Sequence, residues 1–218
     1  ALDHYSLDLP TVKGTFVAPT VLEIKSLEQL THEVFGPVLH VIRYKRSELP
    51  QLVQSINDSG YGLTLGIHTR IDETIDFITQ RAHVGNIYVN RNIVGAVVGV
   101  QPFGGEGKSG TGPKAGGPLY LKRLQRNAPA GPQHQRQAPP ALDALTVWAK
   151  MHGHDKVQQL AQEYARTTLL GSTTVLPGPT GERNTLSFAA RGTILCAAAN
   201  TGVLMNQLAA VLATGNQA

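Results

Sequence analysis

Hydrophobic and polar residues follow two periods in the first half of the chain. Residues 37–44, 63–69 and 85–90 are apolar and β-branched, as in buried strands. Between these runs, apolar residues recur at helical spacing in 49–56 and again in 71–82. The order strand, helix, strand, helix, strand predicts an α/β layer with parallel neighbouring strands.

Local signals predict where some of these elements begin. Ser26 and Gln29 match a capping box that opens a short helix, and Ser47 is a credible N-cap for the helix at 49–56. Residues 15–24 form an extended run that Pro19 interrupts, which indicates an edge or a bulge.

A glycine-rich stretch, residues 101–118, follows the third strand, and we call it the glycine loop. It contains seven glycines and three prolines, so it cannot form a regular helix or strand. A phosphate-binding P-loop is excluded because the motif needs glycine where Pro102 stands. A dinucleotide fingerprint matches at Gly105, Gly107 and Gly110, but prolines flank it and no good helix follows. Composition alone leaves a functional loop and a plain linker open.

The second half of the chain has a different pattern. Residues 126–140 are rich in Pro and Gln, which predicts a linker, and 141–165 return to amphipathic helix. A turn-rich loop at 176–184 is followed by two short strands, 186–188 and 193–197, and a helix at 202–214. The last strand and helix have nothing yet to pack on, so we expect the fold to be cut there.

Composition and charge narrow the classes of function. The chain has 41% hydrophobic and 16% charged residues, which fits a soluble globular protein, and no apolar run is long enough to span a membrane. Cys196 is the single cysteine, so a disulfide framework is excluded and a reducing compartment, the cytoplasm, is expected. A basic stretch lies between Glu106 and Asp143, but it lacks interleaved aromatic residues, so we expect no nucleic-acid binding. His152 and His154 do not share a helix face, so we expect no metal site.

Several motifs together resemble the aldehyde dehydrogenases. Residues 102–105 with 109–110 are similar to that family's PFGG…SG segment, and 33–37 resemble its E-x-F-G-P motif. YGL at 61–63 and GNIYVN at 85–90 fall between the two in the family's order. The sequences of these stretches, and of LPGPTGERNT at 176–185, most resemble the dehydrogenase module of bacterial proline utilization A enzymes.

This resemblance implies oxidation of L-glutamate γ-semialdehyde, the open form of pyrroline-5-carboxylate, to glutamate with NAD. In the family a cysteine thiolate attacks the aldehyde and a glutamate base assists hydrolysis. The family's nucleophile precedes the E-x-F-G-P motif, and Cys196 does not match its segment, so we assign no catalytic residue. We expect this chain alone to be inactive. FAD would be expected only with a fused proline dehydrogenase domain.

The resemblance also implies roles for individual residues. Glu33 would accept hydrogen bonds from the nicotinamide ribose, Phe35 would pack on that ribose, and Leu63 would lie near the nicotinamide ring. Without the motif, Glu33 would pass for an exposed carboxylate and Phe35 for a core residue.

The implied substrate-binding residues lie further along the chain. The backbone N–H groups of Gly95 and Ala96 would bind the substrate carboxylate, and Phe103 would form an aromatic wall around its aliphatic stem. Without the resemblance, Gly95 and Ala96 would pass for a bend in a strand.

The same resemblance suggests how the chain is divided. Residues 1–125 would be part of the aldehyde dehydrogenase catalytic domain, and 126–140 a linker. Residues 141–190 would form a helix and a β-flap for homo-oligomerisation, and 191–218 the start of a Rossmann-like domain. The alternative is a non-catalytic assembly piece that keeps the glycine loop for structure only.

Overall fold

The computed structural model describes residues 4–7, 13–126 and 138–218. The chain divides into two compact units. The first comprises Ala1–Ala96 with Phe103–Gly117, and the second comprises Val97–Pro102 with Pro118–Ala218. Most of the predicted linker, residues 127–137, lies outside the described residues.

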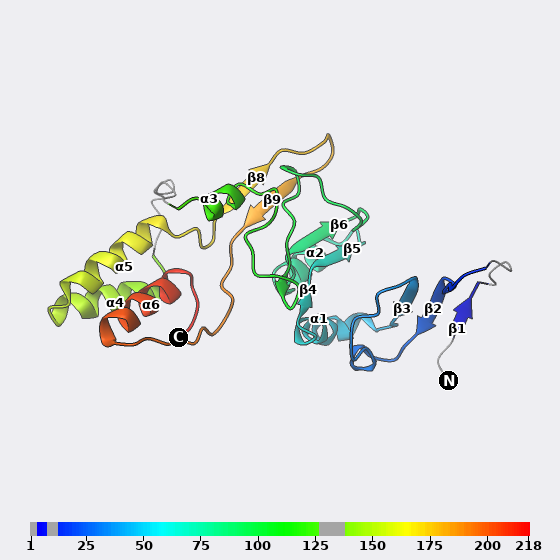
Figure 1. Cartoon of the computed structure of the whole chain (residues 1–218), viewed down its shortest axis with the longest axis horizontal. Coiled ribbons are helices and arrows are strands. Elements are labelled where there is room, and N and C mark those ends of the chain that lie inside the picture. The colour runs from blue at the N-terminus through cyan, green and yellow to red at the C-terminus, as the bar shows by residue number, and fades with distance from the viewer. Residues whose placement is uncertain (1–3, 8–12, 127–137) are drawn as a thin grey trace. The chain divides into compact units, whose positions relative to one another are not determined.

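Three strands form a small sheet at the start of the first unit (Figure 1). They are β1 (His4–Ser6), β2 (Thr20–Glu23) and β3 (Val38–Val41), in the order β1-β2-β3. β1 pairs antiparallel with β2, and β2 pairs parallel with β3. The short helix η1 (Leu27–Gln29) between β2 and β3 has the predicted capping box, since the Gln29 side chain accepts a hydrogen bond from the Ser26 N–H at 3.3 Å.

The predicted alternation of helices and strands is confirmed in the rest of this unit. Its elements are α1 (Leu49–Asp58), β5 (Thr64–Ile67), α2 (Asp72–Thr79) and β6 (Asn86–Val89). β5 and β6 are parallel neighbours, with Leu65 opposite Ile87. The residues Val53, Ile67, Val84 and Tyr88 are buried.

Two details of the first unit differ from the prediction. β3 belongs to a different sheet from β5 and β6, because its partner is β2, and periodicity alone does not specify which strands are neighbours. Ser47 is not an N-cap, because it lies within the short helix η2 (Arg46–Glu48) that leads directly into α1. Glu48 takes the N-cap position, and Pro50 stands in the first turn, where a missing N–H costs no helical hydrogen bond.

The glycine loop is largely irregular, as its composition predicts. A two-residue strand, β7 (Glu106–Gly107), pairs antiparallel with β4 (Tyr61–Gly62). The two arms of the loop meet at an isolated bridge between Phe103 and Ala115. The stretch therefore has a defined shape and is anchored to the strands of the first unit.

Three helices and a hairpin make up most of the second unit (Figure 1). The helices α4 (Pro140–Met151), α5 (Asp155–Thr167) and α6 (Thr201–Ala213) pack on one another. Their shared core contains Leu142, Leu145, Ala161, Ala209 and Ala213. The short helix α3 (Tyr120–Leu124) precedes them, and β8 (Thr173–Leu176) pairs antiparallel with β9 (Asn184–Ser187) around the predicted turn-rich loop.

Three expectations for this unit were wrong. The single helix at 141–165 is two helices, because the chain turns at Gly153, whose φ is +70°, a value that glycine adopts without strain. Residues 193–197 form no strand in the described chain; Thr193 makes one bridge, with Gln217. The helix α6 does have partners, because its apolar residues pack on α4 and α5.

Candidate functional site

A cleft of about 790 Å³ lies within the first unit. It is bordered by η1, the irregular segment 31–34, the end of α1, the β4–β5 region and the tip of the glycine loop. The lining side chains with polar or charged groups include Glu28, Glu33, Asp58, Lys108 and Ser109. Segments far apart in sequence therefore meet around one cleft.

Two of the three predicted cofactor-binding residues line this cleft. Glu33 comes from the irregular segment before β3, and Leu63 lies between β4 and β5. Phe35 does not line it, and its side chain is 97% exposed. A phenylalanine of the core would be buried, so the interpretation of Phe35 as a core side chain is wrong.

Carboxylates and one ammonium group face the cleft. The Ser26 hydroxyl, followed by the Glu28 backbone N–H, lowers the pKa of the Glu28 carboxyl by hydrogen bonding. Among the other lining residues, Lys108 Nζ donates to the Ser59 carbonyl at 2.8 Å and lies 4.9 Å from the centre of the Tyr61 ring. The cleft thus offers carboxylate oxygens that can accept hydrogen bonds from the hydroxyl groups of a ligand.

The glycine loop is attached to this region by its tip. The Lys108 N–H donates to the Gly60 carbonyl at 2.8 Å, and the Ser109 hydroxyl accepts a hydrogen bond from the Gly62 N–H at 3.1 Å. From the sequence, Lys108 was only part of a basic stretch, and Ser109 belonged to the SG pair of the family motif without an assigned role. Their position three and four residues after the PFGG segment was the available signal.

The predicted carboxylate-binding residues, Gly95 and Ala96, lie outside the cleft. Gly95 has a φ of +79°, and nothing lies within 4 Å of the position that a Cβ would occupy. Within the described residues, neither amide N–H donates a hydrogen bond. These two donors are therefore available to an anionic group.

Phe103, the third predicted substrate-binding residue, is half-buried in the arm of the glycine loop. Its N–H donates to the Ala115 carbonyl at 3.0 Å, and the Ala115 N–H returns a bond of 2.8 Å to the Phe103 carbonyl. The six predicted residues thus do not converge on one cavity in this unit. Glu33 and Leu63 share the cleft, while the other four lie at loop positions outside its lining.

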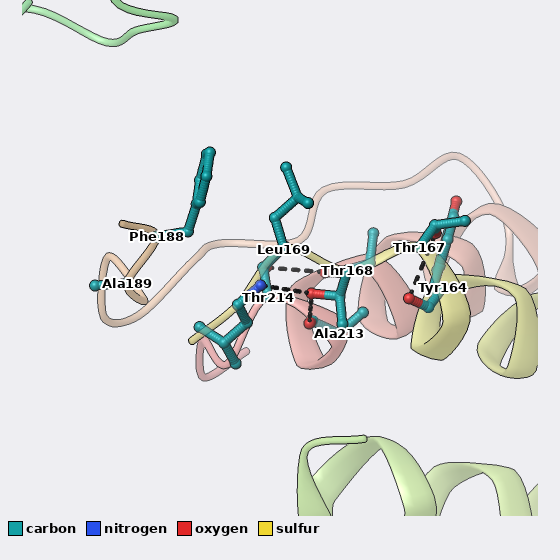
Figure 2. Close-up of a pocket in the computed structure, with 10 residues that line it drawn as sticks. Tyr164, Thr167, Thr168, Leu169, Phe188, Ala189, Ala213 and Thr214 are labelled. Carbon is teal, nitrogen blue, oxygen red and sulfur yellow. Dashed lines mark hydrogen bonds between the residues drawn. The ribbon is translucent and has the colours of Figure 1, made fainter. Parts of the chain in front are cut away.

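A second pocket, of about 430 Å³, lies in the second unit between the ends of α5 and α6 and the segment after β9 (Figure 2). None of the ten described residues that line it is charged. The Thr168 hydroxyl donates to the Ala213 carbonyl at 2.7 Å, and the Thr214 hydroxyl donates to main-chain carbonyls of α6. Because these hydroxyls already donate within the protein and the lining carries no charge, this pocket offers no group suited to acid–base or nucleophilic chemistry.

The histidines near the end of α4 contact an aromatic ring. His152 and His154 stack on the Trp148 ring, with centroid distances of 4.9 and 5.0 Å. No group of three or more His, Cys, Asp or Glu side chains in the described part of the chain is placed to hold a metal ion. Likewise, none of the described helices is both long and apolar enough to cross a membrane.

Comparison with known proteins identifies the class. The family model for the aldehyde dehydrogenase family matches residues 6–127, more than half of the chain, so the chain belongs to the aldehyde dehydrogenase family. The bifunctional protein PutA of Escherichia coli is 53% identical over 220 residues, which cover 94% of this chain and 16% of PutA. The chain therefore spans about a sixth of the length of this curated relative.

Solved structures agree with this assignment. Proline utilization A from Corynebacterium freiburgense has a TM-score of 0.76 and 28% identity, over 99% of this chain and 22% of the other. A 1-pyrroline-5-carboxylate dehydrogenase from Thermus with bound NAD has a TM-score of 0.50 and 42% identity, over 56% of this chain and 23% of the other. The mixed α/β fold is therefore that of part of an aldehyde dehydrogenase.

Proposed function

We propose that this chain contributes cofactor- and substrate-binding surfaces to an NAD-dependent dehydrogenase that oxidises L-glutamate γ-semialdehyde to L-glutamate in proline catabolism. One observation carries the proposal: Glu33 and Leu63, from two separate family motifs, line the same cleft beside the tip of the glycine loop. The relatives named PutA and 1-pyrroline-5-carboxylate dehydrogenase, one of them with bound NAD, support this substrate and this cofactor.

The cleft fits the ribose end of NAD, which supplies the hydride acceptor when bound. The Glu33 carboxylate is exposed and has two oxygens that can each accept a hydrogen bond from a ribose hydroxyl. Leu63 is 40% exposed and gives an apolar surface for the edge of the nicotinamide. Phe35 does not line the cleft, but its exposed ring would supply a second apolar surface for the ribose of a bound cofactor.

The substrate carboxylate binds to the N–H groups of Gly95 and Ala96. Two adjacent N–H donors without a partner in the described chain suit a carboxylate, because a charge-assisted hydrogen bond is about twice as strong as a neutral one. Phe103, paired with Ala115, presents an aromatic wall to the aliphatic part of the substrate.

The test is a chimera in which this chain replaces the matching sixth of Escherichia coli PutA, assayed by NADH formation with the semialdehyde. We expect activity in the chimera, and Glu33→Ala to raise the KM for NAD by about tenfold, as expected for the loss of a charged hydrogen-bond acceptor. Glu163→Ala, at an exposed carboxylate of α5 outside the cleft, is the matched control and should leave both Michaelis constants unchanged. An active chimera in which Glu33→Ala behaves like Glu163→Ala would refute the cofactor role.

We further propose that residues 1–125 belong to the catalytic domain, 126–140 to a linker, 141–190 to the helical and flap region, and 191–218 to the start of a further domain. The β8–β9 hairpin would mediate homo-oligomerisation, and the protein would act in the cytoplasm. Val175 on β8 is 62% exposed, so Val175→Asp should lower the mass measured by light scattering of the chimera. An unchanged mass would count against the hairpin as an interface.

A further inference from the structure

The ammonium group of Lys114 lies among three oxygen atoms from two parts of the first unit, the start of β6 and the glycine loop. Lys114 Nζ donates to the Gly104 carbonyl at 2.7 Å, approaches the Asn86 Oδ1 at 3.4 Å, and also donates to the Gly85 carbonyl. A lysine ammonium has three N–H donors and no acceptor. The three oxygens therefore match its full donor capacity.

Asn86 reinforces the same junction. Its side chain is only 9% exposed, and its Oδ1 accepts a hydrogen bond from the Gly104 N–H at 3.1 Å. Gly85 and Asn86 mark the start of β6, whereas Gly104 belongs to the glycine loop. Lys114 and Asn86 together therefore fasten the loop to the strand through side chains from both partners.

The position of Phe103 depends on this junction. Phe103 directly precedes Gly104, and its bridge partner Ala115 directly follows Lys114. The hydrogen bond from the Lys114 ammonium group to the Gly104 carbonyl therefore joins the two arms of the loop one residue away from the Phe103–Ala115 bridge. A change at Lys114 would release both arms at once, although it alters no atom of Phe103.

The Lys114 side chain is half-buried, so its charge depends on the three oxygen acceptors that surround it. Burial lowers the pKa of Lys114, and the carboxylate of Glu106 offsets part of this effect. A charge in such a place needs hydrogen-bond acceptors in place of water. Conversely, the three oxygens would lose their shared donor if the charge were removed.

We propose that Lys114 is a positioning residue for the substrate side of the active site, where it holds the glycine loop on β6 and so fixes the place of Phe103. This inference rests on the proposed function, since it takes Phe103 to be part of the substrate site. The contacts themselves do not depend on that function, so the two can be tested separately.

The first measurement is hydrogen exchange in the PutA chimera carrying Lys114→Met, which keeps the length of the side chain and removes the donors. We expect the amides of Phe103, Gly104 and Ala115 to exchange about tenfold faster or more, since loss of a charged hydrogen bond lowers the local opening free energy. Lys150→Met, at an exposed position on α4, is the matched control and should leave these amides unchanged. Unchanged exchange in Lys114→Met overturns the proposal whatever the activity.

The second measurement is steady-state kinetics on the same proteins. We expect Lys114→Met to raise the KM for the semialdehyde about tenfold, because Phe103 is no longer held, while the KM for NAD changes less than twofold. Faster exchange with equal changes in both constants would overturn the positioning role. An inactive parent chimera would instead count against the proposed function, and the exchange result would still decide on the Lys114 contacts.

A conservative variant separates positioning from general destabilisation. Lys114→Arg keeps the charge and several N–H donors in a larger, planar group. It should restore at least part of both the slow exchange and the low KM for the semialdehyde, and it provides the measurement if Lys114→Met does not fold. A Lys114→Arg protein that folds but matches Lys114→Met in both readouts would contradict the role of the donors.

Discussion

Gly85 offers a sharp test of how closely the glycine loop packs on β6. A Cβ at this position would lie 1.9 Å from the Gly104 carbonyl oxygen and 2.8 Å from both the Gly104 carbonyl carbon and the Gly105 Cα. All three atoms belong to the main chain, so no side-chain rotation can relieve the contact. Gly85→Ala must therefore push the loop away from the strand.

The size of the effect follows from these distances. The Gly104 oxygen has to move by about 1.5 Å to reach ordinary van der Waals contact, which begins at 3.4 Å. Overpacking in a well-packed core costs about 1–3 kcal/mol, and here the shift also lengthens the hydrogen bond that Gly104 N–H donates to Asn86 and the one that its carbonyl accepts from Lys114. The φ of Gly85 is not in the left-handed region, so the backbone itself accepts alanine, and the stiffer unfolded chain would offset at most about 1 kcal/mol of this loss. We expect a net loss of about 3 kcal/mol.

Native-state hydrogen exchange of the Asn86 amide, which donates to the Leu63 carbonyl at 3.1 Å, reports the opening free energy at this point. Gly36→Ala is the matched control, because nothing lies within 4 Å of its added Cβ and its φ is not positive. It should change the opening free energy by less than about 0.5 kcal/mol. If Gly85→Ala also stays within that range, the close packing of the loop on β6 is wrong.

Three further predictions concern other parts of the chain. Leu142→Ala should lower the free energy of unfolding of the helical unit by about 2–5 kcal/mol, because this side chain is fully buried, while Val147→Ala on the exposed face should cost about 0.5 kcal/mol or less. Urea unfolding followed by the fluorescence of the single tryptophan, Trp148, measures both. Gly95→Val in the chimera should raise the KM for the semialdehyde more than that for NAD, because a φ of +79° strains a β-branched residue by about 1–2 kcal/mol. Equal changes in the two constants would contradict the anchoring role. Finally, the pKa of Lys114 is lowered in the folded state, so the unfolded chain binds its proton more strongly. The difference in unfolding free energy between the parent and Lys114→Met should therefore grow as the pH rises from that lowered pKa towards 10.5, the ordinary value. Urea titrations at several pH values measure this difference, and a difference that stays constant or shrinks would contradict the prediction.

Strong periodicity explains which elements could be predicted from the sequence. The parallel pair β5 and β6 and the helix α2 follow from apolar patterns that have one clear period. The run at 193–197 is just as apolar, but it forms no strand in the described chain because it has no neighbour beyond the bridge at Thr193. A strand needs a partner for its backbone groups, and an apolar run alone does not provide one.

In the candidate site, too, the sequence predicted some residues and not others. Motif resemblance pointed to Glu33 and Leu63, and these two residues do line one cleft. It gave no role to Lys114, because in the sequence a lysine within a basic stretch is indistinguishable from a solvated surface charge. The three oxygens that surround its ammonium group come from Gly85, Asn86 and Gly104, and only the folded chain brings them together.

The spacing of the glycines in the loop first suggests phosphate binding, but the structure gives a different physical reason for Gly62, Gly85 and Gly107. A Cβ on Gly62 would lie 2.3 Å from the His83 carbonyl oxygen, and one on Gly107 would lie 2.5 Å from the Gly60 carbonyl oxygen. Together with Gly85 against Gly104, these contacts bring main chain directly onto main chain at three places in the same unit. Glycine at these positions serves the close approach of one backbone to another, not the approach of a phosphate. The absence of side chains at these glycines therefore allows the glycine loop to pack closely on its neighbours, and hydrogen bonds from Gly104 to the side chains of Asn86 and Lys114 hold the loop in this position.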